Sequence, residues 1–459
     1  MNIFKVLLMK KLICILIALL LLSVTGNSLY GQWKKLIKKD PGNWEQLNGT
    51  ALFELKNREI TGTTVINSPN SFLCTKEIYE DFILEFDTWF DPQMNSGVQI
   101  RSESKPDYQD GRVHGYQVEM DPSTRAWSGG IYDEARRGWL YTLDKNPEGQ
   151  KALMVGEWNQ YRVEAIGNSI RTWVNGVACA DLVDALTPVG FIALQVHSVG
   201  QDSSRVGLLV KWKNIRIITE NPAKYATPYE PVIPQYSYLD NNLTERETEE
   251  GWKLLFDGKT SDGWINAKTK SFPESGWEII EGALSINPVS KKHGGGGDLV
   301  TISKFKNFEL IVDFMYTDGA NSGIKYFVDT ESDNGSLASI GCEYQVLDDR
   351  IHPDAKAGIA GNRTLAGLYD LIGPKNKRDN GADQWNRATI VVSGNKVQHW
   401  LNGFLTVEYE RSTPEWRELV ATSKFKTSPG FGEVLEGRIL LQDHGNIVSF
   451  KNIKLREVK

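Results

Sequence analysis

The amino-acid sequence predicts an all-β protein composed of two tandem β-sandwich domains. Two observations lead to this prediction: a set of short segments that occurs twice in the same order, and runs of alternating apolar and polar residues separated by Gly, Asn, Asp and Pro. The alternation has a period of two, which is the period of a strand with one buried face. Strands at this spacing are typical of antiparallel sandwiches and barrels.

The internal repeat comprises seven pairs of segments. The first copies are Asn95–Val98, Gly115–Val118, Gly130–Asp133, Glu157–Asn159, Val174–Gly176, Leu194–His197 and Trp212–Arg216. The second copies are Asn321–Ile324, Glu343–Val346, Gly367–Asp370, Gln384–Asn386, Leu401–Gly403, Leu441–His444 and Phe450–Lys454. Matched residues lie 226 to 247 positions apart, a spread that loop-sized insertions explain. The repeat therefore predicts two copies of one domain.

The repeat and the composition together divide the chain into four parts. We expect a signal peptide at residues 1–31, a first sandwich domain at 32–220 and a second at 251–459. The intervening residues 221–250 contain four prolines and an acidic end, which is typical of a stiffened linker. Each domain is thus close to 200 residues long, enough to bury a core of its own.

The N-terminal segment has the pattern of a secretory signal. Met9-Lys10-Lys11 is a basic start, Leu12–Leu22 is an apolar run, and small or polar residues follow from Ser23. An apolar run of about 11 residues is shorter than the roughly 20 that cross a bilayer, so we expect no membrane insertion. The predicted location is the periplasm or the extracellular medium.

Strands and turns can be assigned along the first domain. Residues 82–90, 161–166 and 169–174 alternate as strands, and the short breaks at 167–168 and 175–176 predict two consecutive hairpin turns. No segment of useful length has a helical period. The second domain begins at Gly251 and repeats the same all-β pattern to its end.

The charge of the chain argues against two classes of partner. Its formal charge is −6, and it becomes −9 without residues 1–31, which hold three lysines and no acidic residue. An acidic protein is not expected to bind nucleic acid or an anionic membrane as its main partner. We expect a small-molecule substrate instead.

Polar side chains recur on one face of the predicted strands. Residues two apart on a strand share a face, which groups Gln99 with Arg101, Gln117 with Glu119, Gln195 with His197, Glu343 with Gln345, and Gln442 with His444. Amide, carboxylate, imidazole and guanidinium groups at matched positions favour a concave polar sheet that binds a ligand rich in hydroxyl groups. Aromatic residues such as Tyr132 and Tyr369 could stack on sugar rings.

The carboxylates on this face do not form the pair that most glycosidases use. Retaining enzymes need two carboxyl groups about 5 Å apart, but the segments around Glu343 and Glu119 each supply one. A lone carboxylate with a histidine, an amide and Asp348 or Asp133 suits either a divalent cation or a general base with orienting groups. Both alternatives stay open at this point.

Several of these segments resemble one family. Gly251–Trp264, with its Leu-Phe-Asp-Gly core, resembles the opening signature of the 3-keto-disaccharide hydrolase domain family. Asn321-Ser322-Gly323, Glu343-Tyr344-Gln345 and the stretch from Leu441 to Ile453 resemble its later blocks. The first domain resembles a divergent copy. The resemblance covers nearly the whole mature chain, and it implies concanavalin A-like jelly-roll sandwiches, export, and action on glycosides oxidised at C3.

Each copy departs from the family pattern. The second has Phe327 where the pattern commonly keeps the arginine that the first has as Arg101. The first lacks the opening signature and has Gly115 in place of Glu343. Which copy is active is therefore left open.

The implied reaction assigns roles to the candidate residues. A C3 carbonyl acidifies the C2 hydrogen, so one base can start a β-elimination that releases the glycosidic oxygen. We expect His444 or His197 as the base, Glu343 or Glu119 as a metal ligand or orienting group, and Lys325 or Arg101 beside the enolate. The expected substrate-binding residues are Gln345, Gln442, Tyr369, Asp370, Gln117, Gln195, Tyr132 and Asp133.

A divalent cation (Ca²⁺, Mn²⁺ or Mg²⁺) is a further expectation, with Glu343 and Asp348 as its ligands. Two alternatives to an enzyme remain. A non-catalytic pair of carbohydrate-binding modules would keep the amides and aromatic residues without needing a histidine or carboxylate. An adhesion or scaffold protein would use the sandwiches as spacers, and the repeated polar face disfavours it.

Overall fold

The computed structural model describes residues 33–37, 42–288, 296–330 and 340–458. The chain divides into two compact units, one of residues up to 136 with 141–234, and the other of residues 137–140 with 235–459. We call them domain 1 and domain 2 and describe each by itself. The expected signal peptide at 1–31 lies outside the described residues. No helix in the described part of the chain is long and apolar enough to cross a membrane.

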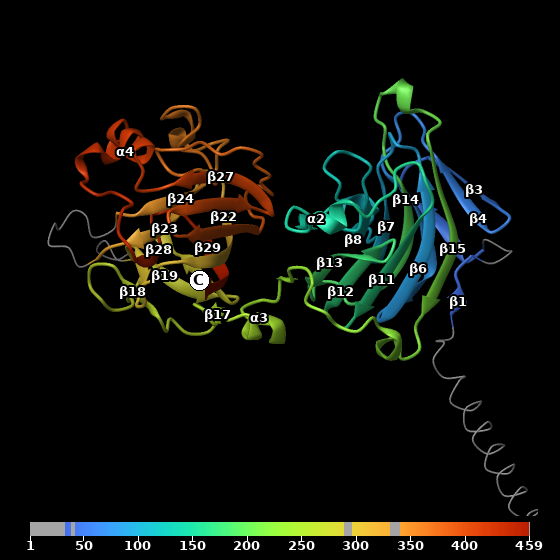
Figure 1. Ribbon diagram of the computed structural model, residues 1–459, viewed down its shortest axis with the longest axis horizontal. Helices are drawn as coiled ribbons and strands as arrows, with labels where there is room; N and C mark the ends of the chain where they lie inside the picture. The colour runs from blue at the N-terminus through green and yellow to red at the C-terminus, as the bar shows by residue number, and fades with distance from the viewer. Residues whose placement is uncertain (1–32, 38–41, 289–295, 331–339, 459) are drawn as a thin grey trace, which may run out of the picture. The chain divides into compact units, whose positions relative to one another are not determined.

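Domain 1 is a sandwich of two antiparallel sheets (Figure 1). Sheet A has the order β13 (Val177–Val183), β12 (Ser169–Val174), β11 (Asn159–Ile166), β6 (Phe82–Phe90), β15 (Leu209–Ile218), β4 (Glu59–Thr63) and β3 (Leu52–Lys56), and β1 (Lys34–Lys35) also pairs with β15. Sheet B has the order β9 (Ile131–Glu134), β8 (His114–Met120), β7 (Ser96–Glu103), β14 (Gly190–Val196), β5 (Ser71–Tyr79) and β2 (Trp44–Leu47).

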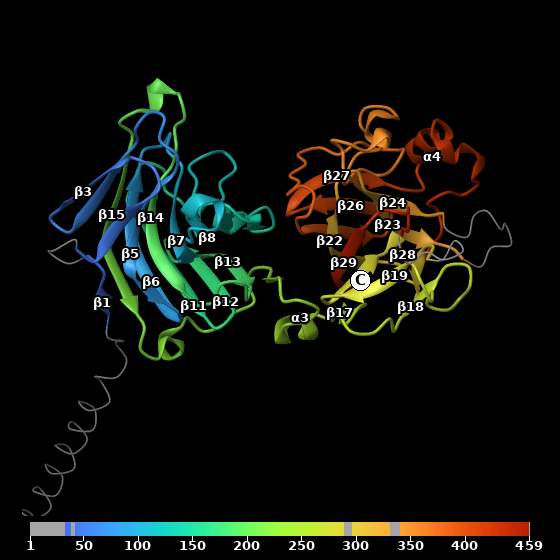
Figure 2. The same cartoon turned by 180° about the vertical axis from the view of Figure 1, so that it is seen from behind.

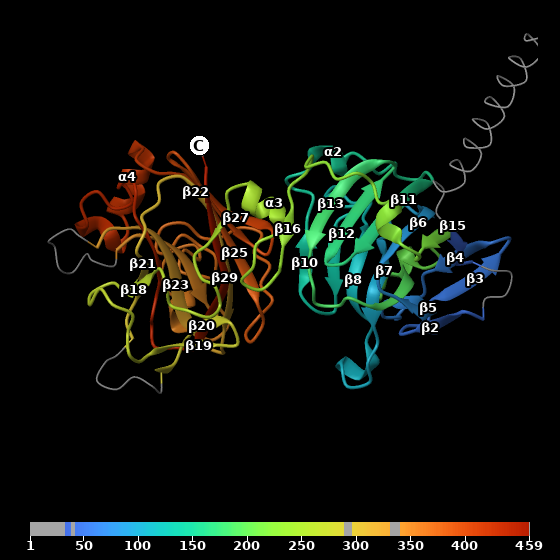
Figure 3. The same cartoon turned by 90° about the horizontal axis from the view of Figure 1, so that it is seen from below.

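Domain 2 repeats this architecture (Figure 2). Sheet C has the order β19 (Trp277–Ile280), β20 (Ala283–Ile286), β29 (Val448–Glu457), β22 (Phe308–Tyr316), β25 (Asn386–Ser393), β26 (Lys396–Leu401) and β27 (Phe404–Glu410), with β17 (Lys253–Leu254) beside β29. Sheet D has the order β18 (Trp264–Asn266), β21 (Leu299–Thr301), β28 (Arg438–Leu441), β23 (Asn321–Val328) and β24 (Cys342–Leu347). Figure 3 shows β21 and β23 in one layer and β25 and β29 in the other.

The remaining elements are short. They are β10 (Gly138–Tyr141), β16 (Tyr236–Ser237), the helices α2 (Pro147–Gln150), α3 (Glu245–Glu249) and α4 (Pro414–Ala421), and the 3₁₀ turns η1 (Gln109–Gly111), η2 (Ser203–Arg205), η3 (Pro222–Tyr225), η5 (Pro353–Lys356) and η6 (Lys424–Thr427). The predicted all-β fold of two tandem concanavalin A-like jelly-roll sandwiches is confirmed.

The predicted hairpin turns are also confirmed. Strand β12 follows β11 through residues 167–168, and β13 follows β12 through Asn175-Gly176. Both residues of that second turn have positive φ, 49° and 81°, the backbone form that an Asn-Gly pair adopts easily. Asn175 Oδ1 also accepts the backbone N–H of Gln160 at 2.9 Å, which ties the turn to β11.

Alternation along the strands separates the core from the polar face. On β24, Tyr344 and Val346 lie in the core cluster of domain 2 together with Phe314 and Tyr326. Glu343 and Gln345, which alternate with them along β24, lie on the opposite face of sheet D because successive side chains point to opposite sides. The fold thus carries its polar residues on sheet D in domain 2 and on sheet B in domain 1.

Candidate functional site

Domain 2 places an ammonium group beside a carboxylate on the polar face of sheet D. Lys325 on β23 and Glu343 on β24 are direct cross-strand partners, and Lys325 Nζ lies 3.8 Å from Glu343 Oε2. Gly323 is on the same face two residues before Lys325. A Cβ atom there would come within 2.3 Å of Glu343 Oε1, so the glycine leaves the room that the carboxylate occupies.

Glu343 is almost fully buried, with 5% of its surface exposed. Burial raises its pKa above the ordinary value, while the positive charges of Lys325 and Lys424 act in the opposite direction. Burial in turn lowers the pKa of Lys424. The site therefore holds a buried carboxylate with Lys325 beside it, and the exposed Lys424 lies near enough for its charge to act on the same carboxylate.

One amide contacts this pair, and a second amide residue is tied to β23 through its backbone. With its nitrogen turned toward Glu343, the Gln345 side chain donates to Glu343 Oε1 at 3.3 Å and to the backbone oxygen of Ser322 at 3.1 Å. Gln442 follows β28, and its backbone N–H donates to the oxygen of Gly323 at 2.9 Å. Glu343 and Gln345 thus lie on β24, and Gln442 follows β28, the strand on the other side of β23 in sheet D.

Tyr369 lies beside Glu343 at the edge of the sheet. Its backbone N–H donates to the oxygen of Glu343 at 3.0 Å, and its phenol donates to Asp354 Oδ2 at 2.7 Å. Lys424 Nζ is 3.9 Å from the centroid of the Tyr369 ring, a distance at which the ring face attracts a cation. The aromatic ring predicted as a sugar platform therefore also holds the second ammonium group.

An arginine connects the loops around this tyrosine. Arg363 Nε donates to Asp370 Oδ1 at 2.6 Å and Nη1 donates to Asp354 Oδ1 at 3.1 Å. The other oxygen of Asp370 accepts the backbone N–H of Lys424 at 2.7 Å. Asp370, predicted to bind substrate, is 7% exposed and holds the segment that carries Lys424.

The sequence analysis did not single out Arg363, Asp354 or Lys424. The first two lie in a loop of ordinary polar composition. Lys424 lies in residues 411–437, which connect β27 to β28, whereas only residues 184–189 connect the matched strands of domain 1. This insertion is the sequence feature that could have pointed to Lys424, because it adds a cation that the first copy lacks.

The two predicted histidines lie at matched places after β14 and β28. His444 is exposed, and its ring centroid is 6.2 Å from that of His352. His352 Nδ1 accepts the backbone N–H of Asp354 at 3.2 Å. In domain 1, His197 Nδ1 lies 2.8 Å from the backbone oxygen of Ser198. His444 also lies close enough to Glu343 for its positive charge to favour the ionised carboxylate.

The strand pairing of domain 1 shows that one pair of repeat segments was aligned two residues out of register. The repeat matched Glu343 with Gly115, and this correspondence is wrong. Gln99 stands at the position of Lys325, and its cross-strand partner is Gln117, as the partner of Lys325 is Glu343. The residue that corresponds to Glu343 is therefore Gln117, two places further along β8.

A second pair of contacts confirms this register. The backbone N–H of Glu119 donates to the oxygen of Gly130 at 3.0 Å, and that of Gln345 donates to the oxygen of Gly367 at 3.1 Å. Glu119 therefore corresponds to Gln345. The Lys–Glu pair of domain 2 is replaced in domain 1 by two uncharged amides.

These amides form a buried hydrogen-bond network. Gln117 Oε1 accepts from Gln99 at 2.6 Å and from Gln195 at 2.8 Å, and Gln117 Nε2 donates to Glu119 at 2.9 Å. Asn95 Nδ2 donates to the second oxygen of Glu119 at 2.5 Å. Burial raises the pKa of Glu119 to about 7 despite these two donated bonds. Its counterpart in domain 2 is the uncharged Gln345.

Arg101 does not lie on the polar face, contrary to the prediction that paired it with Gln99. A β-bulge between Ile100 and Glu103 changes the alternation, and Arg101 has a φ of 45°. Its side chain is 1% exposed and donates to the backbone oxygens of Glu80 and Gly167 and to Asp81. Its guanidinium group is consumed in structural bonds, so the expected role beside an enolate is wrong.

The other predicted residues of domain 1 are also engaged within the fold. Tyr132 pairs with Gln117 across β8 and β9, the place that Tyr369 has in domain 2. Asp133 is fully buried, and its carboxylate lies 2.7 Å from Nη2 of Arg136. Domain 1 thus conserves the shape of the polar face but not its charges.

The residues around Glu343 do not fit a divalent cation. Asp348, the second expected ligand, lies five residues further along the chain, about 17 Å away if extended, and accepts from Gly319 N–H and the Arg350 guanidinium. The charges that act most strongly on Glu343 are the ammonium groups of Lys325 and Lys424, ahead of the carboxylate of Asp298, whereas a divalent cation of this kind takes about six or more oxygen ligands. Within the described residues there is no group of three His, Cys, Asp or Glu side chains placed to hold a metal ion.

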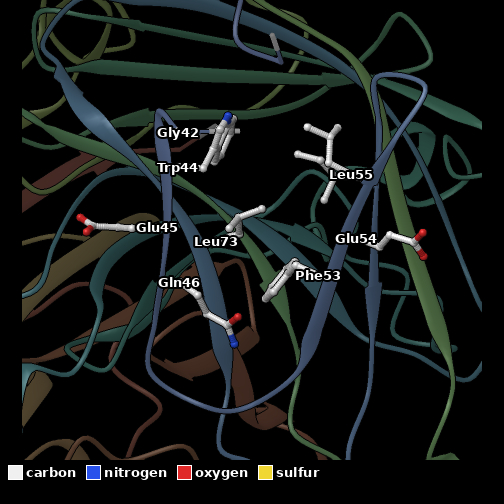
Figure 4. Close-up of a pocket in the computed structure, with 9 residues that line it drawn as sticks. Gly42, Trp44, Glu45, Gln46, Phe53, Glu54, Leu55 and Leu73 are labelled. Carbon is white, nitrogen blue, oxygen red and sulfur yellow. The ribbon is translucent and has the colours of Figure 1, made fainter. Parts of the chain in front are cut away.

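Domain 1 also has an apolar cleft between β2 and the β3–β4 hairpin (Figure 4). Its volume is about 430 Å³. Trp44, Phe53, Leu55 and Leu73 line it, while the carboxylates of Glu45 and Glu54 point outward on either side. It contains none of the predicted site residues.

Two known proteins similar to this chain cover about half of its length each. A "3-keto-disaccharide hydrolase" from Bacteroides thetaiotaomicron is 39% identical over 230 residues, which is 45% of this chain and 78% of that protein. The crystal structure of a putative glycosyl hydrolase from Parabacteroides distasonis is 29% identical, with a TM-score of 0.43, over 48% of this chain and 100% of that one.

The family model described as "3-keto-alpha-glucoside-1,2-lyase-like domain" matches residues 25–218 and again residues 251–456. Both matches follow the internal repeat, and together they span most of the sequence. The chain belongs to the family of 3-keto-alpha-glucoside-1,2-lyase-like domains, of which it contains two copies.

Proposed function

We propose that this protein is an exported enzyme that cleaves the glycosidic bonds of 3-keto-glycosides, including 3-keto-disaccharides, and that domain 2 carries the activity. The observation that supports the choice of domain is the Lys325–Glu343 pair, which domain 1 replaces with Gln99 and Gln117. Export is proposed from the signal sequence at residues 1–31.

The proposed reaction is a β-elimination followed by addition of water. A base takes the hydrogen at C2 as a proton, and the electron pair left behind forms an enolate with the C3 carbonyl. The enolate then forms the C1–C2 double bond as the C1–O bond breaks, and the departing oxygen receives a proton. Water finally adds its oxygen to C1 and a proton to C2, which gives net hydrolysis with atoms and charges balanced.

This chemistry needs a base and positive charge near the developing enolate oxygen. We assign the base to His444, because imidazole is the side chain whose ordinary pKa lies nearest neutrality. Its imidazolium form then returns the proton to the departing oxygen. Lys325 stabilises the enolate, and Glu343 orients Lys325 from 3.8 Å. Gln345 and Gln442 bind sugar hydroxyl groups.

The test compares a 3-keto-disaccharide with its unoxidised parent in D₂O, followed by NMR. The expected result is release from the keto substrate alone, with deuterium at C2 of the product. Equal release from both sugars would contradict elimination. Sugar binding without release from either would make the protein a carbohydrate-binding module, the alternative function.

The two histidines provide a matched pair of variants. His444→Ala should lower kcat on the keto substrate by about 100-fold or more, the usual contribution of a general base. His197→Ala, in domain 1, should leave kcat unchanged. If His444→Ala retains full turnover, another group is the base.

A further inference from the structure

The outer face of sheet A in domain 1 contains an open polar groove. Its volume is about 390 Å³, and Asp87, Gln160, Asn214 and Arg216 are among the residues that line it. It is built on the strands β6, β11 and β15, on the side of the sheet opposite the core. Domain 2 has the same strands at the corresponding place, so the two surfaces can be compared residue by residue.

Both domains form the same bulge on this face. Asn214 in β15 has a φ of 54° and Asn452 in β29 a φ of 50°. Asn214 Nδ2 donates to Asp87 Oδ2 at 2.6 Å, and Asn452 Nδ2 donates to Asp313 Oδ2 at 2.6 Å. The two asparagine–aspartate pairs are therefore equivalent.

The lysine before each asparagine is also equivalent. Lys213 Nζ lies 3.7 Å from the ring centroid of Trp158, and Lys451 Nζ lies 4.5 Å from that of Trp385. The two surfaces thus share the same strands, the same asparagine–aspartate pair and the same lysine over a tryptophan. They differ in what covers them.

In domain 2 a segment of the chain fills the groove. Asn241 and Asn452 form a reciprocal pair: the Asn241 N–H donates to Asn452 Oδ1 at 2.5 Å, and the Asn452 N–H donates to Asn241 Oδ1 at 2.9 Å. The preceding Asp240 makes an ion pair with Lys451 at 2.6 Å. Arg387 Nη1 donates to the backbone oxygen of Ser237 at 2.9 Å.

This cover changes the exposure of the central asparagine. Asn452 is 3% exposed, whereas Asn214 is an exposed residue. Gln160 stands where domain 2 has Arg387, the partner of Asp313. In domain 1 the groove therefore keeps Asn214 and Lys213 but has no counterpart of Arg387, which in domain 2 bonds both Asp313 and the covering segment.

The charges around the groove favour an acidic partner. Lys213, Arg216 and the exposed Lys35 and Arg58 surround Asn214. The carboxylate Glu85 is already engaged by two arginines, Arg162 and Arg216. The second carboxylate, Asp87, accepts from Asn214, and the cations around the groove still outnumber the two carboxylates, so an approaching chain meets a net positive charge.

We propose that this groove binds an extended acidic peptide segment of a partner protein that contains an Asp-Asn sequence. The asparagine of the partner forms with Asn214 the reciprocal pair that Asn241 forms with Asn452, and the aspartate contacts Lys213 as Asp240 contacts Lys451. The site is independent of the sugar chemistry proposed for domain 2.

The test uses a fluorescent peptide with the sequence of residues 235–250 and the full-length protein, measured by fluorescence anisotropy. Saturable binding is expected, and it should weaken with salt because ion pairs contribute. Asn214→Gly should weaken it at least about tenfold, since glycine keeps the positive φ but removes the amide. Peptides with Asp240→Ala or Asn241→Ala should also bind more weakly.

Asn452→Gly is the matched control for the equivalent site in domain 2, and it should leave peptide binding unchanged. A denaturant-unfolding curve of Asn214→Gly with both transitions at the wild-type midpoints shows that domain 1 of this variant is folded. No saturable binding, or equal binding by wild type and Asn214→Gly, would overturn the proposal. Binding that is lost only in Asn452→Gly would also overturn it, because the peptide would then exchange with the native segment of domain 2.

Discussion

At the scale of single residues, the two domains differ in which polar groups are charged. The charges of Lys325 and Lys424 act on Glu343, whereas Gln117 at the same position is bonded to three other side chains. A charged pair can respond to charge that develops in a substrate. The amide network is instead bonded within the fold, because Gln117 would have to break its bonds to Gln99, Gln195 and Glu119 before its side chain could bind a ligand.

Glu119 makes the stability of domain 1 depend on pH. Its pKa is raised to about 7 in the folded protein, so the folded state holds this proton to a higher pH than the unfolded state. The resulting stabilisation is complete below about pH 4.5 and is lost as the pH rises through about 7, by about 3 kcal/mol at most.

Glu119→Gln removes this dependence and should therefore be more stable than wild type at pH 8.5, with little difference at pH 4.5. Denaturant unfolding of domain 1 at the two pH values measures this, and Glu54→Gln on the exposed edge strand β3 is the control. A Glu119→Gln variant that is destabilised equally at both pH values would show that the carboxyl group is not protonated by burial.

Chelation tests the conclusion that Glu343 is not a metal ligand. Because the charges that act most strongly on this carboxylate are the ammonium groups of Lys325 and Lys424, EDTA followed by desalting should leave kcat and KM on a 3-keto-disaccharide unchanged. Loss of turnover that returns with added Ca²⁺, Mn²⁺ or Mg²⁺ would contradict our interpretation of the site.

At the scale of elements, the connection between β27 and β28 distinguishes the two domains. Residues 411–437 include α4, whose N-cap Thr413 accepts the N–H of Trp416 at 3.1 Å, and η6, which carries Lys424. Trp416 stacks on Tyr409, with ring centroids 5.2 Å apart, and so anchors the insertion to the sheet. The insertion thus delivers a cation to the polar face from outside the sheet.

Lys424→Met should lower kcat on the keto substrate by about 100-fold, comparable to removing one donor from a site of developing negative charge. Lys426→Met, an exposed neighbour on the same turn, is the control and should have no effect. Steady-state kinetics of the two variants measures the difference. Equal kinetics for Lys424→Met and wild type would remove Lys424 from the site.

At the scale of the whole molecule, the sequence predicted the architecture well and the details of the site less well. Repetition and alternation are properties of the chain itself, so two sandwiches and their polar faces could be predicted. The register of β8 could not, because a shift of two residues preserves every face. Gly115-Tyr116-Gln117-Val118 resembles Glu343-Tyr344-Gln345-Val346 in letters, but the strand pairing places Gln117 opposite Gln99.

Two other features of the structure differ from the sequence prediction: the position of Arg101, and the presence of Lys424 and Arg363 at the site. A bulge displaced Arg101 from its expected face, and alternation alone does not reveal bulges. Lys424 and Arg363 reach the site through loops, and their contacts depend on tertiary structure. The predicted residues Lys325, Glu343, Gln345 and Tyr369 nevertheless lie together, since they belong to adjacent segments of one sheet.

The central claim is that domain 2, and not domain 1, cleaves the substrate. The most direct measurement is the rate at which Glu343→Gln and Gln117→Ala variants of the full chain release sugar from a 3-keto-disaccharide. Glu343→Gln is expected to lower kcat by about 100-fold or more, while Gln117→Ala is expected to leave it unchanged. Full turnover by Glu343→Gln together with loss of turnover in Gln117→Ala would contradict the claim and place the chemistry in domain 1.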